Sequence, residues 1–220
     1  MIEGADGSGK ATQARLLANA LEEYGPVSSF EFPRYKKSTF GNLIGRCLAG
    51  EFGDFLKLSP YLSSLPYILD RARAKCLLDE ALKEGNVVCD RYTPSNLVFQ
   101  SAKLPRGERA AFTQFLETGE YEELGLPVPD LVIYLSVPAH ISADLIALKQ
   151  KRSYLSKQGA KDIHEKNVAY QETVIGIYKE MTKKRAEWKL IECFERGKML
   201  SREDIHHKVM NLVKNFLKIA

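Results

Sequence analysis

A glycine-rich segment near the start of the sequence has the residue pattern of a phosphate-binding loop. Residues 4–10 read GADGSGK, which matches GxxxxGK, and apolar residues at helical spacing follow. Glycines let successive backbone N–H groups turn toward phosphate oxygens, and the N-terminus of the next helix adds positive potential. A lysine at the end of such a loop reaches the β- and γ-phosphates of a nucleotide. The residues predicted to bind these phosphates are Gly4, Asp6, Gly7, Ser8, Gly9, Lys10, Ala11 and Thr12.

The residue after Lys10 departs from the usual pattern and moves the expected metal ligand elsewhere. A serine or threonine at this position normally supplies a hydroxyl to magnesium, which the methyl group of Ala11 cannot do. Magnesium would then be held by phosphates, water and a carboxylate. Asp90, at the carboxyl end of a predicted buried strand, has the position of such an acid. We therefore expect Asp90 to hold the metal.

Arg91, directly after Asp90, predicts a second phosphate site at the tip of the same strand. A guanidinium group can hold a phosphate through two N–H groups at once. The alternative is a surface ion pair between the two neighbouring residues. Their place at the carboxyl edge of a buried strand, in line with the glycine-rich loop, favours the phosphate site.

The spacing of apolar residues predicts the alternating helices and strands that position these groups. Strands are expected at 27–32, 86–90, 130–135 and 187–193, and helices at 9–24, 40–48, 60–82 and 202–217. The third helix is expected to be interrupted or kinked near Pro66, and Ser201 is expected to cap the last. β-Branched runs bounded by turn residues are typical of strands covered on both faces. This order predicts an α/β fold with a parallel sheet that binds ligands at its carboxyl edge.

Composition indicates one globular domain over residues 1–220. The charge balance, 32 Lys and Arg against 28 Asp and Glu, gives +4 without a polybasic run, which favours a small anionic ligand over nucleic acid. No stretch approaches the roughly 18 apolar residues that span a membrane. Four cysteines without metal-ligand spacing indicate reduced thiols and a cytoplasmic protein. Only three residues precede the loop, so the first strand is expected to be shorter than the usual length of about five.

Six segments, in order, make the chain resemble the thymidylate kinase family over nearly its whole length. They are IEGADGSGKATQ, FPRYKKSTFGNLI, LPYILDRARAK, DRYTPSNLVFQ, PDLVIYLSVP and DIHE. The resemblance implies a three-layer α/β/α P-loop fold with a five-stranded parallel sheet and a short lid. It also implies transfer of the γ-phosphate of ATP to dTMP with magnesium, giving dTDP, and a homodimer formed by the apolar helices before Asp90.

The resemblance also implies which residues bind the acceptor. Arg91 would clamp the phosphate of dTMP with help from Arg34, Arg71 would donate to O4 of the pyrimidine, and Tyr67 would stack on the base. The other implied acceptor contacts are Asp6, Phe32, Tyr35, Asn96, Phe99, Gln100, Asp162 and Glu165, the last also a metal ligand with Asp90.

These assignments have simpler alternatives. Phe32, Tyr67 and Phe99 could be ordinary core aromatics, and Arg34 and Arg71 could be solvated charges at helix ends. Asp70, next to Arg71, is interpreted as a structural residue that orients its neighbours.

The basic segment 149–161, KQKRSYLSKQGAK, is either a solvated loop or the implied lid over ATP. The resemblance implies a catalytic arginine in the glycine-rich loop or in the lid. Because Lys10 is the only basic residue of the loop, Arg152 is expected to join Lys10, Asp90 and Arg91 in catalysis.

Three positions depart from the family pattern. They are Ala11, Phe99 where tyrosine is common, and Ser136 where an acid is frequent. Two alternatives therefore stay open, namely a kinase for another pyrimidine nucleotide and a nucleotide-binding regulator without catalysis.

Overall fold

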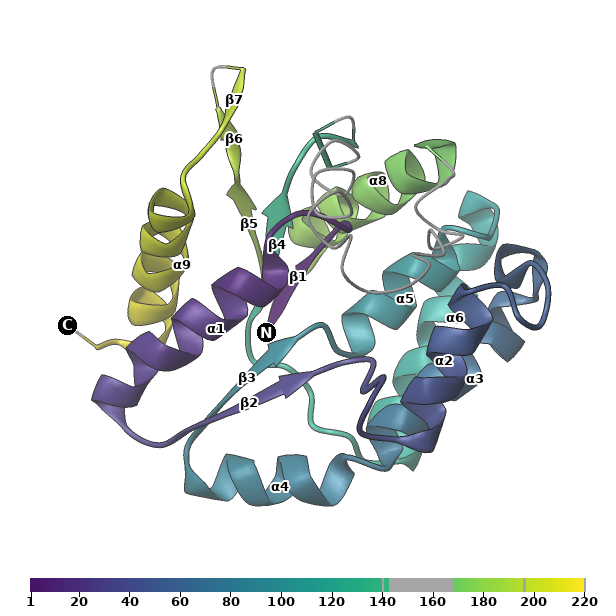
Figure 1. Cartoon of the computed structure of the whole chain (residues 1–220), viewed down its shortest axis with the longest axis horizontal. Helices are drawn as coiled ribbons and strands as arrows, with labels where there is room; N and C mark the ends of the chain where they lie inside the picture. The colour runs from purple at the N-terminus through teal and green to yellow at the C-terminus, as the bar shows by residue number, and fades with distance from the viewer. Residues whose placement is uncertain (140, 143–167, 196, 220) are drawn as a thin grey trace, which may run out of the picture.

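A five-stranded sheet organises the computed structural model, which describes residues 1–139, 141–142, 168–195 and 197–219 (Figure 1). The strands lie in the order β2-β3-β1-β4-β5, and every neighbouring pair is parallel. The predicted five-stranded parallel sheet is therefore confirmed. The strands are β1 (Ile2–Gly4), β2 (Val27–Glu31), β3 (Asn86–Asp90), β4 (Val132–Ser136) and β5 (Trp188–Glu192).

Helices cover both faces of the sheet, as Figure 1 shows for α1 and α9 on one side and α5 and α8 on the other. The described helices are α1 (Lys10–Leu21), α2 (Thr39–Leu48), α3 (Pro60–Ala72), α4 (Lys75–Glu84), α5 (Thr93–Ser101), α6 (Arg109–Glu117), α8 (Val168–Lys184) and α9 (Arg202–Leu217). The short helical turns are η1 (Glu22–Tyr24), η2 (Phe55–Lys57), η3 (Arg106–Glu108) and the π-helix η4 (Thr118–Glu123). A two-stranded hairpin of β6 (Phe194–Glu195) and β7 (Lys198–Met199) follows β5.

Strand β4 lies inside the sheet between β1 and β5, and its two covered faces explain its continuous apolar run. Ile133 and Leu135 belong to the core cluster that includes α1 and α9, whereas Val132 and Tyr134 belong to the cluster that includes α5 and α8. Successive side chains of a strand point to opposite faces, so a strand covered on both sides is apolar at every position. All five residues of β4 are buried.

The predicted helix 60–82 is two helices, and the interruption expected at Pro66 is absent from the described helix α3. The helix continues through Pro66 and ends at Ala72, and α4 begins at Lys75. Proline removes one helical hydrogen bond. Helix α3 nevertheless continues through Pro66, because its packing against α2 and α5 stabilises it. The chain turns instead after Arg71, where the N–H of Ala74 donates to the Arg71 carbonyl at 2.8 Å.

Other boundaries agree with the sequence or were not predicted. Helix α9 spans the expected residues, and the Ser201 hydroxyl accepts a hydrogen bond from the Asp204 N–H at 3.0 Å. Helices α5, α6 and α8 were not predicted, although Thr93-Pro94 at the start of α5 is a typical helix start. The lid segment 149–161 lies outside the described residues. No helix in the described ranges is long and apolar enough to cross a membrane.

The parallel order brings the ends of β1, β2 and β3 to one edge. The N–H of Arg91 donates to the Ile2 carbonyl at 3.1 Å, and the N–H of Phe32 donates to the Asp90 carbonyl at 3.0 Å. The glycine-rich loop follows β1 at the same edge. Segments far apart in sequence therefore meet where parallel sheets bind ligands.

Candidate active site

The glycine-rich loop closes around the Lys10 side chain. Gly7 and Gly9 have φ of 78° and 88°, left-handed values that glycine adopts without strain. A Cβ on Gly4 would lie 2.5 Å from the Ser8 Oγ, so this close approach also requires glycine. The Lys10 Nζ donates to the Ala5 carbonyl at 2.7 Å and lies 4.0 Å from the Asp6 Oδ1. The loop thus holds its own ammonium group at its centre.

The environment of Lys10 makes its ammonium group easy to deprotonate. Burial and, second, the nearby Arg91 charge lower the pKa of Lys10 to about 8, while the carboxylates of Asp6, Asp90 and Glu3 oppose this shift. Two positive side chains lie close together in a partly desolvated place. Such a place is suited to a ligand that carries several negative charges.

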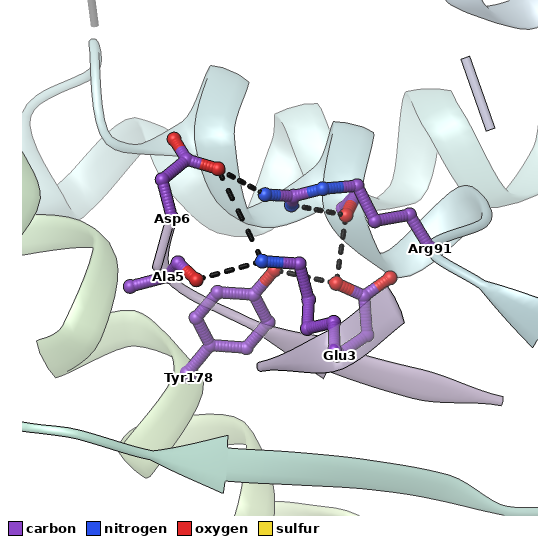
Figure 2. Close-up of polar contacts among 7 residues, drawn as sticks. Glu3, Ala5, Asp6, Arg91 and Tyr178 are labelled. Carbon is purple, nitrogen blue, oxygen red and sulfur yellow. Dashed lines mark hydrogen bonds and ion pairs between the residues drawn. The ribbon is translucent and has the colours of Figure 1, made fainter. Parts of the chain in front are cut away.

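Arg91 connects the tip of β3 to the loop (Figure 2). Its Nη2 donates to the Asp6 Oδ1 at 2.5 Å and its Nη1 donates to the Ser95 Oγ at 2.9 Å. The guanidinium carbon lies 4.9 Å from the centroid of the Phe99 ring. The φ of Arg91 is 63°, a strained value for a residue with a side chain, and such strain is concentrated at functional sites. Three contacts and a left-handed backbone conformation therefore fix where this arginine points.

Glu3 orients Arg91 through Ser95, and the sequence analysis gave Glu3 no role. Its side chain is fully buried in β1 and accepts hydrogen bonds from the hydroxyls of Ser95 and Tyr178, each at 2.7 Å (Figure 2). It also accepts from the Tyr92 N–H at 3.2 Å. Because the Ser95 hydroxyl donates its proton to Glu3, the Ser95 oxygen accepts the hydrogen bond from Arg91. A carboxylate inside an apolar strand, one residue before the loop, is the signal that could have identified it.

A pocket opens beside this arginine, and most predicted acceptor-binding residues line it. Of these, the structure brings Asp6, Phe32, Tyr35, Tyr67, Arg71, Arg91, Asn96, Phe99 and Gln100 to its walls. The remaining lining residues are Pro33, Leu48, Asp70, Tyr92 and Ser95. The predicted residues Arg152, Asp162 and Glu165 lie outside the described residues.

Arg34 is not among the residues that line the pocket. Its backbone N–H donates to the Asp70 Oδ2 at 2.8 Å, and the Ser38 hydroxyl donates to the other oxygen of the same carboxylate. The Ser38 oxygen in turn accepts from the Gly41 N–H at the start of α2. Asp70 is thus a buried group that fixes the segment between β2 and α2, as its interpretation as an orienting residue predicted.

Arg71 forms a buried, two-pronged ion pair with Glu120 of η4. The Arg71 Nε and Nη2 donate to the two carboxylate oxygens at 2.5 and 2.6 Å, and the Thr93 hydroxyl donates to the same carboxylate at 3.0 Å. The two charged side chains are 2% and 0% exposed, so the alternative of a solvated helix-end charge is wrong for Arg71. Burial alone would lower the pKa of Arg71, but the charge and hydrogen bonds of Glu120 raise it.

Two polar atoms in the pocket wall have no hydrogen-bond partner among the described residues. These atoms are the Asn96 Oδ1 and the Tyr92 Oη. The Asn96 Nδ2 donates to the Ser64 carbonyl at 3.4 Å, which turns the amide oxygen away from that carbonyl. Buried polar atoms are nearly always hydrogen-bonded in folded proteins. These two atoms are therefore exceptions to that rule within the described residues.

Some aromatic side chains of the pocket also pack in the protein core, which was the alternative to a role in ligand binding. Phe32 is 3% exposed, and its ring centroid lies 5.5 Å from that of Tyr92. The Tyr67 ring lies 6.3 Å from that of Phe55. Both Phe32 and Tyr67 also line the pocket, so packing and ligand contact are not exclusive here.

The assignment of Asp90 and Glu165 as metal ligands stays a prediction. Within the described ranges, no group of three or more His, Cys, Asp or Glu side chains could hold a metal ion. Asp90 ends β3 beside the loop, and Glu165 lies outside the described ranges. The carboxylates of Asp6, Asp90 and Glu3 all act on the Lys10 ammonium, so carboxylate oxygens lie near the loop. Oxygen ligands with added phosphates suit magnesium.

Comparison with known proteins agrees with this geometry. A model of the thymidylate kinase family matches residues 2–205. The chain is 31% identical to a thymidylate kinase of Mycobacterium tuberculosis, covering 82% of this chain and 83% of the relative. It is 33% identical to a probable thymidylate kinase of Pyrococcus horikoshii, covering 99% and 96%. A solved thymidylate kinase from Candida albicans, 20% identical, has the same fold with a TM-score of 0.72 over 97% of this chain and 89% of that one. The chain therefore belongs to the thymidylate kinase family.

Proposed function

We infer that this protein transfers the γ-phosphoryl group of ATP to dTMP and releases ADP and dTDP. The observation that carries this inference is the position of Arg91, whose guanidinium joins the phosphate loop to the pocket through Asp6. A donor triphosphate on the loop and a monophosphate in the pocket would both lie within reach of this side chain. Family membership supplies the identities of the two substrates.

The reaction needs alignment and charge compensation more than proton transfer. An anionic oxygen of the dTMP phosphate attacks the γ-phosphorus, and the bond from that phosphorus to the bridging oxygen of ADP breaks. The attacking oxygen carries no proton near neutral pH, so a general base is not required. We propose that Lys10, Arg91 and Arg152 compensate the negative charge that spreads over the transferred group.

We propose that the pyrimidine ring occupies the end of the pocket that Asn96, Tyr67 and Arg71 line. The free Asn96 Oδ1 can accept the N3–H of thymine. Glu120 occupies two donors of Arg71 and leaves the third nitrogen for a carbonyl oxygen of the base. The Tyr67 ring would contact the flat face of the base.

We propose that magnesium accompanies ATP and that Asp90 holds it, with Glu165 as a further ligand. The oxygen-rich surroundings of the loop fit this hard cation. When bound, magnesium neutralises charge on the β- and γ-phosphates. Ala11 contributes no ligand, so the carboxylate of Asp90 carries more of the metal's coordination than in loops with a hydroxyl at this position.

ATP binding is expected to weaken as the pH rises above about 8, because Lys10 loses its proton there in the free protein. A bound triphosphate favours the charged ammonium and raises the pKa of Lys10. Binding therefore takes up protons near pH 8, and the dissociation constant approaches an increase of about tenfold per pH unit above it. Titration calorimetry with MgATP between pH 7.5 and 9.5, in two buffers of different ionisation enthalpy, measures both effects.

The matched control for this titration is Lys10→Arg, which keeps its charge over the whole range. The variant is expected to bind MgATP without proton uptake and with little pH dependence. Equal proton uptake by both proteins would assign the titration to another group.

The function itself is tested by ADP release with MgATP against dTMP, dUMP, UMP, CMP, AMP and GMP. A preference for dTMP supports the proposal. A preference for another pyrimidine monophosphate would support the proposed phosphoryl transfer and contradict dTMP as the acceptor. MgATP binding without turnover of any acceptor would favour a nucleotide-binding regulator.

We propose a homodimer formed through α3. The side chains of Leu62, Leu65 and Leu69 are 63%, 43% and 43% exposed, and they form one apolar stripe at helical spacing. The rings of Tyr61 and Phe115 lie beside each other with centroids 4.9 Å apart, and the two residues are 38% and 40% exposed. A second copy of the chain would cover this surface with the same surface of its own.

Leu65→Glu is expected to convert the dimer to a monomer, because it places a charge at the centre of the stripe. Sedimentation or light scattering measures the mass. Phe216→Glu, which adds the same charge at an exposed apolar residue of α9, is the control and is expected to stay dimeric. Wild-type protein that sediments as a monomer would reject the dimer.

We also propose that the protein is cytoplasmic. All four cysteines are free thiols, and three of them are buried. Proteins that keep their cysteines reduced are typical of the cytosol.

A further inference from the structure

We propose that Lys103, which does not line the pocket, is a positioning residue that holds two pocket walls in place for dTMP. This inference rests on the proposed function, because it concerns the affinity for the acceptor. Lys103 lies just after α5, and its backbone N–H donates to the Gln100 carbonyl at 3.1 Å. Its side chain reaches across to α3 and η2, two elements remote from it in sequence.

The Lys103 ammonium contacts three groups at once. It donates to the Phe55 carbonyl and to the Ser63 Oγ, each at 2.8 Å. It also lies 4.9 Å from the centroid of the Phe55 ring, over its face. Both the backbone and the ring of Phe55 are therefore fixed by one cation.

The first wall that depends on Lys103 contains Gln100. The Ser63 hydroxyl lies 2.7 Å from the Gln100 Oε1, and both side chains are 1% exposed. Because Lys103 donates to the Ser63 oxygen, the single proton of that hydroxyl is directed to its nearest acceptor, Gln100. Hydrogen bonds in such a chain strengthen one another at low dielectric. The amide oxygen is thereby occupied, and the amide nitrogen is the donor that remains for the pocket.

The competing partners of Ser63 show why the cation matters. The same hydroxyl lies 2.9 Å from the Ser59 carbonyl and 3.5 Å from the Pro60 carbonyl, within its own helix. Serine hydroxyls in helices commonly donate to such carbonyls. Without Lys103 the hydroxyl is free to turn to Ser59, and Gln100 loses the bond that sets its amide.

The second wall contains Tyr67. Its ring lies 6.3 Å from the buried ring of Phe55, tilted by 46°. Moving Phe55 therefore moves the surface against which Tyr67 rests. Tyr67 and Gln100 both line the pocket, so Lys103 acts on both from outside it.

The protonation state of Lys103 agrees with this role. Burial lowers the pKa of Lys103 to about 8, and the charge of Asp54 opposes this shift. Asp54 also caps η2, where its carboxylate accepts from the Leu56 N–H at 3.0 Å. Removing the Lys103 ammonium from water costs free energy, and neither of the two groups to which it donates is charged. This cost favours a role for Lys103 in positioning the pocket walls.

The test is a double-mutant cycle of Lys103→Met and Ser63→Ala, with the dissociation constant of dTMP measured by calorimetry. Each single variant is expected to raise the dissociation constant of dTMP by about 5- to 30-fold. The double variant is expected to bind dTMP no more weakly than the weaker of the two single variants. The KM for ATP is expected to change less than twofold. Lys75→Met, which removes another partly buried lysine that pairs with Asp79 on α4, is the control and is expected to bind dTMP normally.

The outcomes separate this inference from the proposed function. If wild type does not bind dTMP, the proposed function fails. If wild type binds and Lys103→Met binds equally well, or if the two effects multiply independently, the relay through Ser63 is rejected. A lowered melting temperature with unchanged dTMP affinity would give Lys103 a purely structural role. Should Lys103→Met not fold, Lys103→Gln takes its place in the cycle.

Discussion

Glu120→Gln is expected to lower the free energy of unfolding by about 3 to 5 kcal/mol, because it leaves the Arg71 charge buried without a counter-charge. For a chain of this length that loss corresponds to a decrease in melting temperature of about 6 to 20 °C. The amide keeps the shape of the carboxylate and can still accept from Thr93, so the change removes charge rather than volume. Thermal and denaturant unfolding of the purified variant measure the loss.

A neighbouring ion pair supplies the matched control. Glu117 at the end of α6 pairs with Arg185, and both side chains are 28% exposed. Glu117→Gln makes the same chemical change in a partly exposed pair and is expected to cost about 1 kcal/mol, less than the fully buried pair. Equal losses in the two variants would contradict the importance of burial.

A double variant separates the stability of the pair from its use in binding. Arg71→Met together with Glu120→Gln removes both charges and is expected to recover more than half of the lost stability, because an apolar replacement of a buried ion pair is often neutral. It is not expected to recover dTMP binding, since the donor for the base is absent. Recovery of binding along with stability would remove Arg71 from the acceptor site.

Arg91→Ala is expected to reduce kcat/KM for dTMP by about 100- to 1000-fold, the range for loss of one positioned donor that stabilises developing charge. The guanidinium is oriented before any substrate arrives by Asp6, Ser95 and the ring of Phe99. The alanine variant loses charge and orientation together. Steady-state kinetics with dTMP and MgATP varied in turn divide the effect between kcat and KM.

Two further variants, Arg91→Lys and Arg73→Ala, are the controls for this experiment. Arg91→Lys keeps the charge but cannot bond Asp6 and Ser95 at once, so an intermediate loss is expected. Arg73→Ala removes an exposed arginine at the end of α3 and is expected to retain full activity. Full activity of Arg91→Ala would reject the phosphate clamp.

The parts of this site that follow from local chemistry could be predicted from the sequence. The glycine-rich loop, Asp90 and Arg91 each combine a recognisable residue type with a place at the end of a strand. The sheet was predictable for a similar reason, because strands covered on both faces have a distinct residue pattern. Helix 60–82 shows the limit of such rules, since packing carried the chain through Pro66.

The supporting residues could not be predicted because their partners are remote in sequence. Glu120 lies 49 residues from Arg71, and Glu3 lies 92 residues from Ser95. The segment TGEYEE offers three glutamates in similar local surroundings, and only the π-helical turn selects the first of them to face Arg71. Identifying such residues requires the tertiary structure.

The position of β1 in the middle of the sheet has a consequence for how the chain is made. Ile2 pairs with Asp90 on one side and with Ile133 on the other, whereas β2 and β3 pair along their whole length without it. On the ribosome the first strand therefore emerges long before either of its partners. Contacts of such long sequence separation form late and slowly. We therefore expect the nascent chain to complete its nucleotide-binding loop only after β4 has left the exit tunnel, and ATP binding by stalled chains would mark the length at which the sheet closes.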